Sequence, residues 1–321
     1  MGIEISIQDI KVVIININGD ILISVKHHEP LRKKRKITLE DIIELSNKAL
    51  KAINLTWNNI SVLGVGTAGI IDEINGKILL LPNAPNLENL KIVQALREKT
   101  GVKNIHITDY VRSMAVSESR YGKGKEFDNF ILFNICADLG AGIIINKKLI
   151  SGSMGIVGEI GHIYVGESRE LCVCGNYGCL ESVASGSALV NRAKDAISKG
   201  VFTSMSDLKL KNDSIQIDDI IEAAKQGDKL AVNLIEETTK YLSIGVSTLM
   251  NLLDPQAIIL AGALINKAGD LLIKPLVTET EAKTLPWIRK HINLFPSELG
   301  EYISARGAAR LAIDRSFDVI F

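Results

Sequence analysis

One short segment, residues 158–181, constrains the fold of this chain more than any other. It reads GEIGHIYVGESRELCVCGNYGCLE. It contains four residues of the kind that bind zinc: His162, Cys172, Cys174 and Cys179. Zinc in a structural site takes about four nitrogen or sulfur ligands, and a Cys3His set leaves no position for a reactive water. Gly175 and Gly178 let the backbone curl tightly enough for three sulfurs to face one point. The segment therefore predicts a structural zinc site.

Two other interpretations of these cysteines stay open. Free buried cysteines are common in intracellular proteins, and a disulfide such as Cys174 to Cys179 is conceivable in a secreted one. The close spacing favours zinc over both, and a closed zinc site stabilises its loop by on the order of 10 kcal/mol. Cys136 is the fourth cysteine and lies in an apolar run, so we expect an ordinary core cysteine there.

Length and composition predict two lobes and a cytoplasmic location. A chain of 321 residues exceeds what one hydrophobic core usually supports. Lysine plus arginine equals aspartate plus glutamate at 37 each, so the whole chain has no nucleic-acid footprint. We find no signal peptide and no apolar stretch near the roughly 20 residues of a membrane helix. We therefore expect a cytoplasmic protein with no membrane partner.

The order of strand-like and helix-like segments indicates an α/β fold. Residues 2–13 and 19–25 are β-branched runs typical of a hairpin. Residues 38–52 follow as an amphipathic helix with Thr38 as N-cap, and residues 60–71 as a buried strand. Strand, helix and strand in this order imply a parallel sheet covered by helices. Further helices are predicted at 110–121, 185–199, 217–226, 229–253 and 303–314, a second hairpin at 130–146 and a further strand at 257–261.

The motif G-E-I-G-H followed by C-x-C-G-x-x-G-C-x-E resembles the signature of the ROK family, which groups sugar kinases with sugar-responsive transcriptional repressors. The resemblance covers nearly the whole chain and is closest to the effector domain of the repressor branch. It implies an α/β, actin-like ATPase (ribonuclease H-like) fold with two lobes and a ligand cleft between them. Residues 1–117 plus 302–321 would form the first, smaller lobe, and residues 118–301 the larger lobe with the zinc loop.

The resemblance also implies a set of sugar contacts. The positions at which the family contacts a pyranose are occupied here by Asn83, Asp109, Glu159, His162 and Glu181. Asn86 is a nearby rival of Asn83, and turn chemistry alone would also favour asparagine there. One ring nitrogen of His162 would bind zinc while the other donates to a sugar hydroxyl or a carboxylate. The alternative for Glu159 and Glu181 is that they are surface acids.

Asp109 occupies the position of the general base of the family's kinases. In those enzymes the aspartate accepts the proton of the sugar hydroxyl that attacks the γ-phosphoryl group. Thr108 replaces the asparagine that precedes this aspartate in the kinases. N-capping of the following helix would explain Asp109 equally well. A carboxylate here can also accept a hydrogen bond from a sugar without catalysis, so Asp109 alone does not predict an enzyme.

Three segments that bind ATP in ROK kinases are altered in this chain. The first hairpin resembles D-I-G-G-T, but residues 4–8 read EISIQ, and Ile7 adds a branched side chain where phosphate needs bare amides. Cys136-Ala137-Asp138 replaces the G-T-G phosphate loop, which removes a hydroxyl and adds a negative charge. Ala261-Gly262-Ala263 replaces a G-G-G turn. We therefore expect ATP and Mg²⁺ not to bind.

These features favour a sugar-sensing effector module of a ROK-type regulator, which binds a sugar or sugar phosphate and has no catalytic residue. The alternative is an ATP-dependent hexose or N-acetylhexosamine kinase with Asp109 as general base. An interaction protein without a ligand is a third, weaker hypothesis. The family further implies a homodimer or tetramer.

Contact with DNA is expected only through a helix-turn-helix domain that is not in this chain, since the sequence starts on the first strand of the module. The most basic run, RKKRK at residues 32–36, could be a DNA or phosphate patch. Five residues without interleaved aromatics favour a solvated loop instead.

Overall fold

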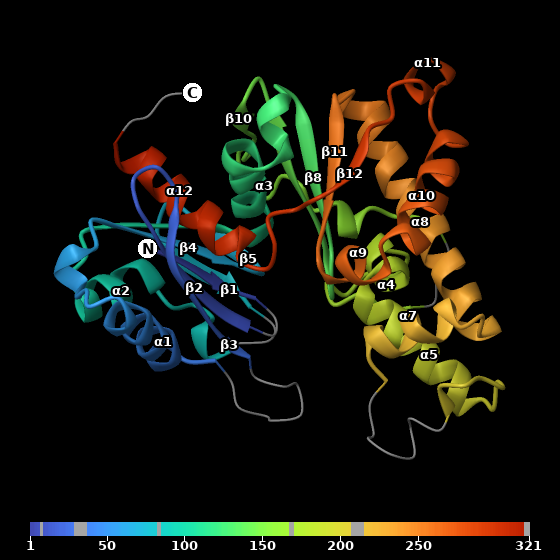
Figure 1. Ribbon diagram of the computed structural model, residues 1–321, viewed down its shortest axis with the longest axis horizontal. Helices are drawn as coiled ribbons and strands as arrows, with labels where there is room; N and C mark the ends of the chain where they lie inside the picture. The colour runs from blue at the N-terminus through green and yellow to red at the C-terminus, as the bar shows by residue number, and fades with distance from the viewer. Residues whose placement is uncertain (7–8, 29–36, 82–84, 167–169, 207–214, 318–321) are drawn as a thin grey trace. The chain divides into compact units, whose positions relative to one another are not determined.

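The computed structural model describes residues 1–6, 9–28, 37–81, 85–166, 170–206 and 215–317 (Figure 1). Contacts divide the chain into two compact units. Unit 1 comprises Met1–Leu132, Gly142–Val157 and Ser297–Phe321, and unit 2 comprises Phe133–Ala141 and Gly158–Pro296. The elements are mixed α and β, as predicted. The basic run at 32–36 lies outside the described residues.

The sheet of unit 1 has five strands in the order β3-β2-β1-β4-β7. They are β1 (Gly2–Ile5), β2 (Asp9–Ile15), β3 (Ile21–His28), β4 (Val62–Thr67) and β7 (Asn104–Asp109). Strand β1 pairs antiparallel with β2 and parallel with β4, and β4 pairs parallel with β7. The predicted parallel sheet is therefore present on one side of β1, and an antiparallel meander on the other.

The single strand expected over residues 2–13 is wrong, because the run divides into β1 and β2. Ser6 and Asp9 close a turn between the two strands. The Ser6 N–H donates to the Asp9 carbonyl at 3.0 Å, and the Asp9 N–H donates to Ser6 Oγ at 3.2 Å. A serine hydroxyl that bonds a nearby backbone amide competes with strand pairing, and β-branched neighbours hide that signal in the sequence.

Four helices of unit 1 accompany this sheet: α1 (Leu39–Ala52), α2 (Ile92–Thr100), α3 (Tyr110–Tyr121) and α12 (Ile303–Ser316). Figure 1 shows α1 and α2 on the opposite side of the sheet from α12. A small second sheet pairs β5 (Ile70–Asp72) with β6 (Lys77–Leu80). Thr38 caps α1 as predicted and forms a capping box with Asp41. Short 3-10 turns occur at Trp57–Asn59, Pro85–Leu87 and Lys123–Glu126.

Helix α12 packs closely on the sheet and on α3 because a glycine lies at each contact. A Cβ on Gly64 of β4 would lie 1.9 Å from the Ala308 carbonyl oxygen. A Cβ on Gly307 of α12 would lie 1.7 Å from the Ser113 carbonyl oxygen of α3. Because both neighbours are backbone atoms, they cannot rotate away. The glycines therefore fix the spacing between the last helix and the layers beneath it.

The second sheet has the order β10-β9-β8-β11-β12. Its strands are β8 (Phe130–Ile135), β9 (Leu139–Ile145), β10 (Lys148–Leu149), β11 (Ala257–Ala261) and β12 (Leu294–Pro296). Unit 2 also contains η4 (Ile160–His162), α4 (Leu180–Ala184), α5 (Gly186–Ser198), α7 (Ile217–Lys225), α8 (Lys229–Leu253), α9 (Ala263–Ala268), α10 (Asp270–Glu281) and α11 (Pro286–Arg289). Helix α8 packs against α4, α5, α7 and α10.

The bounds of α8 follow from its sequence. The Asp228 side chain accepts the Ala231 N–H and caps the start of the helix, and Asp254 ends it in the left-handed region at φ 43°. Pro255 comes next, and proline cannot continue a helix. Even this longest helix is not apolar enough to cross a membrane, and the same holds for every other helix among the described residues.

The close approach of α12 to α3 predicts that Gly307→Ala destabilises the protein by more than about 2 kcal/mol, measured by urea unfolding. Alanine by itself would favour the helix by about 1 kcal/mol, so the loss reports the backbone clash. Gly245→Ala in α8 is the matched control, since its Cβ would meet a leucine methyl, Leu180 Cδ2, at 2.7 Å. Equal effects of the two substitutions would contradict this account of the packing.

Candidate functional site

The segment with the cysteines is anchored at both ends by secondary structure of unit 2. It leaves η4 after His162 and enters α4 directly after Cys179. Between these anchors Tyr164 and Cys179 form an antiparallel bridge. The Val165 N–H donates to the Gly178 carbonyl at 2.8 Å, and the Leu180 N–H donates to the Ile163 carbonyl at 3.0 Å. Residues 163–165 thus pair with residues 178–180, and this pairing places His162 beside Cys179.

A tight turn places the first two cysteines. The Gly175 N–H donates to the Cys172 carbonyl, and the Cys172 N–H donates to the Asn176 carbonyl, both at 2.9 Å. Gly175 has φ 89° and Gly178 has φ 76°, a region that favours glycine. A Cβ on Gly178 would also lie 2.4 Å from the Gly166 carbonyl oxygen. The two glycines singled out in the sequence are therefore required by the backbone.

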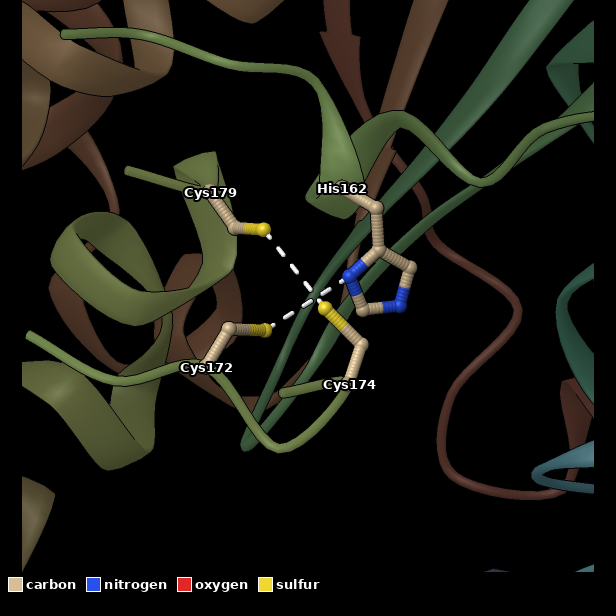
Figure 2. Close-up of side chains that lie close together, drawn as sticks. All are labelled: His162, Cys172, Cys174 and Cys179. Atoms are coloured by element: carbon tan, nitrogen blue, oxygen red, sulfur yellow. Dashed lines mark hydrogen bonds between the residues drawn. The ribbon is translucent and has the colours of Figure 1, made fainter. Parts of the chain in front are cut away.

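The four ligand atoms of His162, Cys172, Cys174 and Cys179 all lie within 4.8 Å of one another (Figure 2). Cys172 Sγ is 3.6 Å from His162 Nδ1, and Cys174 Sγ is 3.7 Å from Cys179 Sγ. In a zinc tetrahedron with bonds of about 2.3 Å to sulfur and about 2.0 Å to nitrogen, these edges are about 3.5 and 3.8 Å. The donor set and its spacing therefore fit a zinc ion.

The same distances exclude the disulfide interpretation. A disulfide joins two sulfurs at about 2.05 Å, whereas Cys174 and Cys179 are free cysteines with their sulfurs 3.7 Å apart. Burial raises the pKa of Cys172 to about 12, so this sulfur stays a thiol at neutral pH unless a cation replaces its proton. Cys136, expected in the core, is only half-buried.

His162 turns its second ring nitrogen toward a carboxylate. Nε2 lies 3.9 Å from Glu159 Oε2, while Nδ1 faces the sulfur cluster. Metal-binding histidines commonly direct their other nitrogen at such a group, which fixes the tautomer. The Glu159 side chain is 53% exposed, so its carboxylate is open to solvent and to a ligand.

Glu181 follows the last cysteine by two residues and holds the start of β9. Its Oε2 accepts the Leu139 N–H at 3.1 Å. Burial raises the pKa of Glu181, and the charge of Asp138 raises it further. Gly161 makes this approach possible, because a Cβ there would lie 2.7 Å from the Leu139 carbonyl oxygen. The G-E-I-G-H motif is thus packed directly on the turn between β8 and β9.

The predicted contacts of unit 1 are described less completely. Asp109 caps α3, and its Oδ1 accepts the N–H groups of Val111 and Arg112 at 2.9 Å each. Asn83 lies outside the described residues, and its rival Asn86 is exposed. The capping role expected from the sequence is therefore present, and the sugar contacts of Asp109 and Asn83 stay a prediction.

Sequence reasoning missed a buried ion-pair network next to Asp109. Glu73 accepts from Thr108 Oγ1 at 2.7 Å and pairs with Arg112 at 3.1 Å and Arg315 at 2.8 Å. The Arg112 side chain is 2% exposed, and its Nη1 has no hydrogen-bond partner among the described residues. Thr108, which replaces the asparagine of the kinases, is thus engaged with Glu73. The sequence did offer one signal of this network: Arg112 is a charged residue on the face of α3 that is buried.

The chain matches the model of the ROK family over residues 1–315. It is 29% identical to the DNA-binding transcriptional dual regulator NagC of Escherichia coli, covering 97% of this chain and 74% of that protein. It is 27% identical to the xylose repressor of Bacillus spizizenii, covering 100% of this chain and 78% of that protein.

A solved ROK glucokinase from Streptomyces griseus, in complex with glucose and AMPPNP, superposes with a TM-score of 0.81 at 29% identity and covers 98% of each chain. This structural match confirms the actin-like fold that the sequence motif implied. The relatives include regulators as well as a kinase, so fold alone does not decide between the two activities.

The network around Glu73 predicts that Arg112→Met costs about 3 kcal/mol of unfolding free energy, because a buried pair loses one partner. Arg315→Met removes the other arginine of the same carboxylate. Since the Arg315 side chain is 31% exposed, that substitution is expected to cost about 1 kcal/mol or less. Chemical denaturation of both variants measures the difference, and an Arg112 variant as stable as the wild type would rule the network out as a structural element.

Proposed function

This chain belongs to the ROK family, and we propose that it is the sugar-binding module of a ROK-type transcriptional regulator with a structural zinc ion. The zinc ligands in this proposal are His162, Cys172, Cys174 and Cys179. The observation that carries the choice of a regulator over a kinase is the turn between β8 and β9. There the Leu139 N–H is already bonded to Glu181, and Asp138 lies close by.

Phosphate-binding turns offer free backbone N–H groups and no negative charge. In this turn the Cys136 N–H donates to the Asp138 carbonyl at 3.0 Å, so two of its amides are engaged within the protein. Asp138 and Glu181 also lie near enough for the charge of one to raise the pKa of the other. A phosphate about 4 Å from either carboxylate would be repelled by about 1 to 4 kcal/mol. The turn therefore supports a loss of ATP binding.

The first hairpin supports the same conclusion. Glu4 occupies the place of the aspartate in the D-I-G-G-T motif of the ROK kinases, and its side chain is buried, at 4% exposed. Lys11, opposite to it on β2, binds this carboxylate at 3.0 Å. A carboxylate that is neutralised by a lysine is a poor partner for Mg²⁺. Ile7 and Gln8 of the same motif lie outside the described residues.

The sugar would be held by polar groups that the zinc loop positions. Glu159, His162 and Glu181 come from this loop or its immediate ends, and Asn83 and Asp109 complete the proposed set. A carboxylate accepts from a sugar hydroxyl, and an imidazole N–H donates to one. His162 links the two functions, because zinc at Nδ1 leaves Nε2 to donate. Zinc would thus shape the sugar pocket without taking part in chemistry.

The second candidate is an ATP-dependent hexose or N-acetylhexosamine kinase. Asp109 favours it, since this residue matches the general base of the ROK kinases, and the S. griseus glucokinase shares the fold over the whole chain. In the regulator, Asp109 would accept a hydrogen bond from the sugar and cap α3. The two candidates share a sugar site and differ in whether a phosphoryl group is transferred.

Four further parts of the proposal concern the oligomeric state, the contact with DNA, the location and the response to sugar. We expect a homodimer or tetramer, which sedimentation velocity would measure. We expect contact with DNA only through a separate helix-turn-helix domain. We also expect a cytoplasmic location. Binding of a sugar would change the population of two conformations of the module, which requires unequal affinity for them.

The proposal predicts that a hexose, an N-acetylhexosamine or one of their 6-phosphates raises the thermal unfolding midpoint while a coupled assay detects no ADP release. At a ligand concentration of 100 times Kd the stabilisation is about 2.7 kcal/mol. Robust ADP release with any of these sugars would establish the kinase instead. No thermal shift with any sugar would remove both sugar-binding candidates.

The exposed carboxylate of Glu159 offers a clean variant for the sugar site. Glu159→Gln is expected to leave the midpoint of the free protein unchanged and to weaken the binding of the stabilising sugar by roughly tenfold. Glu170→Gln, in the same loop and also exposed, is the matched control and should bind like the wild type. Equal sugar affinity in all three proteins would remove Glu159 from the site.

The zinc part of the proposal predicts one zinc ion per chain by elemental mass spectrometry. Cys179→Ser should lower this content and destabilise the protein by several kcal/mol, because binding of the metal and folding of the loop are coupled. Cys136→Ser, which changes the cysteine outside the cluster, should keep the full content. A zinc content near zero in the freshly purified wild type would argue against the site.

A further inference from the structure

Unit 1 contains a cavity whose lining shares no residue with the cysteine cluster or with the proposed sugar contacts. It lies between α3, α12 and the hairpin of β9 and β10, and its accessible volume is about 290 Å³. That is near the lower end of the volumes of small-molecule sites. The lining residues are Val116, Ser119, Arg120, Ile144, Lys147, Lys148, Leu149, Leu311, Asp314 and Arg315.

The charged part of the lining is strongly unbalanced. It contains four basic side chains and a single carboxylate, Asp314. This carboxylate is already paired twice, with Arg310 at 2.8 Å and with Arg120 at 3.6 Å. Arg315 pairs with Glu73 outside the lining. The positive charge of the two lysines is therefore not neutralised from within the cavity.

The two lysines come from the hairpin turn. Lys147 pairs with Asp128 at 3.2 Å, but both side chains are about 60% exposed, and such pairs are weak. Lys148 has no ion pair with a carboxylate among the described residues. A ligand anion would thus meet the Lys148 ammonium group, which pairs with no described carboxylate, and the Lys147 ammonium group, which forms only a weak surface pair.

The backbone of this turn is itself unusual. Strands β9 and β10 are joined by Asn146 and Lys147, which both lie in the left-handed region, at φ 51° and 62°. Two-residue turns of this type favour asparagine followed by glycine. A lysine at the second position costs free energy that a glycine would not. The turn therefore carries a cation at the rim of the cavity at the expense of its own stability.

The remaining wall is apolar. Val116 of α3, Ile144 of β9, Leu149 of β10 and Leu311 of α12 supply it. Cavities that bind small molecules combine such walls with a few convergent polar groups that fix orientation. Most of the charged groups here are positive, and lysine and arginine are the side chains that hold phosphate and carboxylate groups.

We propose that this cavity binds a small amphiphilic anion, a phosphate or carboxylate group attached to an apolar moiety. The anionic group lies at Lys148, Lys147 and Arg315, and the apolar moiety lies against the aliphatic wall. The site is independent of the proposed sugar site, since the two share no residue. If one of the two proposed sites is disproved, the proposal of the other site still holds.

Calorimetric titration with four probes tests the proposal: phenyl phosphate, phenylacetate, benzyl alcohol and inorganic phosphate. We expect at least one of the two aromatic anions to bind roughly tenfold more tightly than both benzyl alcohol and inorganic phosphate. The stronger of the two anions identifies the preferred charged group. Equal affinity for benzyl alcohol would reduce the site to an apolar hollow, and equal affinity for inorganic phosphate would reduce it to diffuse surface charge.

Lys148→Gln is expected to weaken the binding of the preferred anion roughly tenfold, whereas Lys148→Arg keeps most of it. Lys103→Gln, an exposed lysine before β7, is the matched control and should change nothing. Lys147→Gly should also weaken binding, without lowering the thermal midpoint, because glycine suits the turn. Unchanged affinity in Lys148→Gln and Lys147→Gly would overturn the assignment of the cavity.

Discussion

The structure of unit 2 depends on one cluster, in which the imidazole of His162 meets the thiols of Cys172, Cys174 and Cys179. Their possible ligand atoms all lie within 4.8 Å of one another. The segment between η4 and α4 leaves large side chains in solvent, since Tyr164, Leu171, Val173 and Tyr177 are all exposed. A hydrophobic core therefore does not hold this loop in shape. The proposed metal ligation would be strong enough to do so, and the loop would in turn position His162 and Glu181.

Glu181 connects the metal loop to the place where a kinase would hold phosphate. Its carboxylate takes the Leu139 N–H at the end of the turn that contains Asp138, so the same side chain ties down the turn and adds negative charge to it. The arrangement suits a polar, uncharged ligand better than a triphosphate. In the proposed regulator, a loss of nucleotide binding and a retention of sugar contacts would both follow from this one packed arrangement.

The sequence predicted much of this because the decisive features are local. Helix α8 and strand β11 have the predicted bounds, since capping residues and proline mark them, and the four proposed zinc ligands are close in sequence. What it could not predict depends on contacts distant in sequence. The turn at Ser6 and Asp9 was hidden in a β-branched run, and Glu73 meets Arg315 across more than 240 residues. The cavity beside Lys148 likewise arises only when α3, α12 and a hairpin come together.

The most direct test of the central claim is the affinity for the stabilising sugar, measured by calorimetry before and after zinc is removed with a chelator, on protein shown by circular dichroism to remain folded. If zinc shapes the sugar pocket, the zinc-free protein binds at least roughly tenfold more weakly and recovers when zinc is restored. Equal affinity with and without the metal would contradict the account.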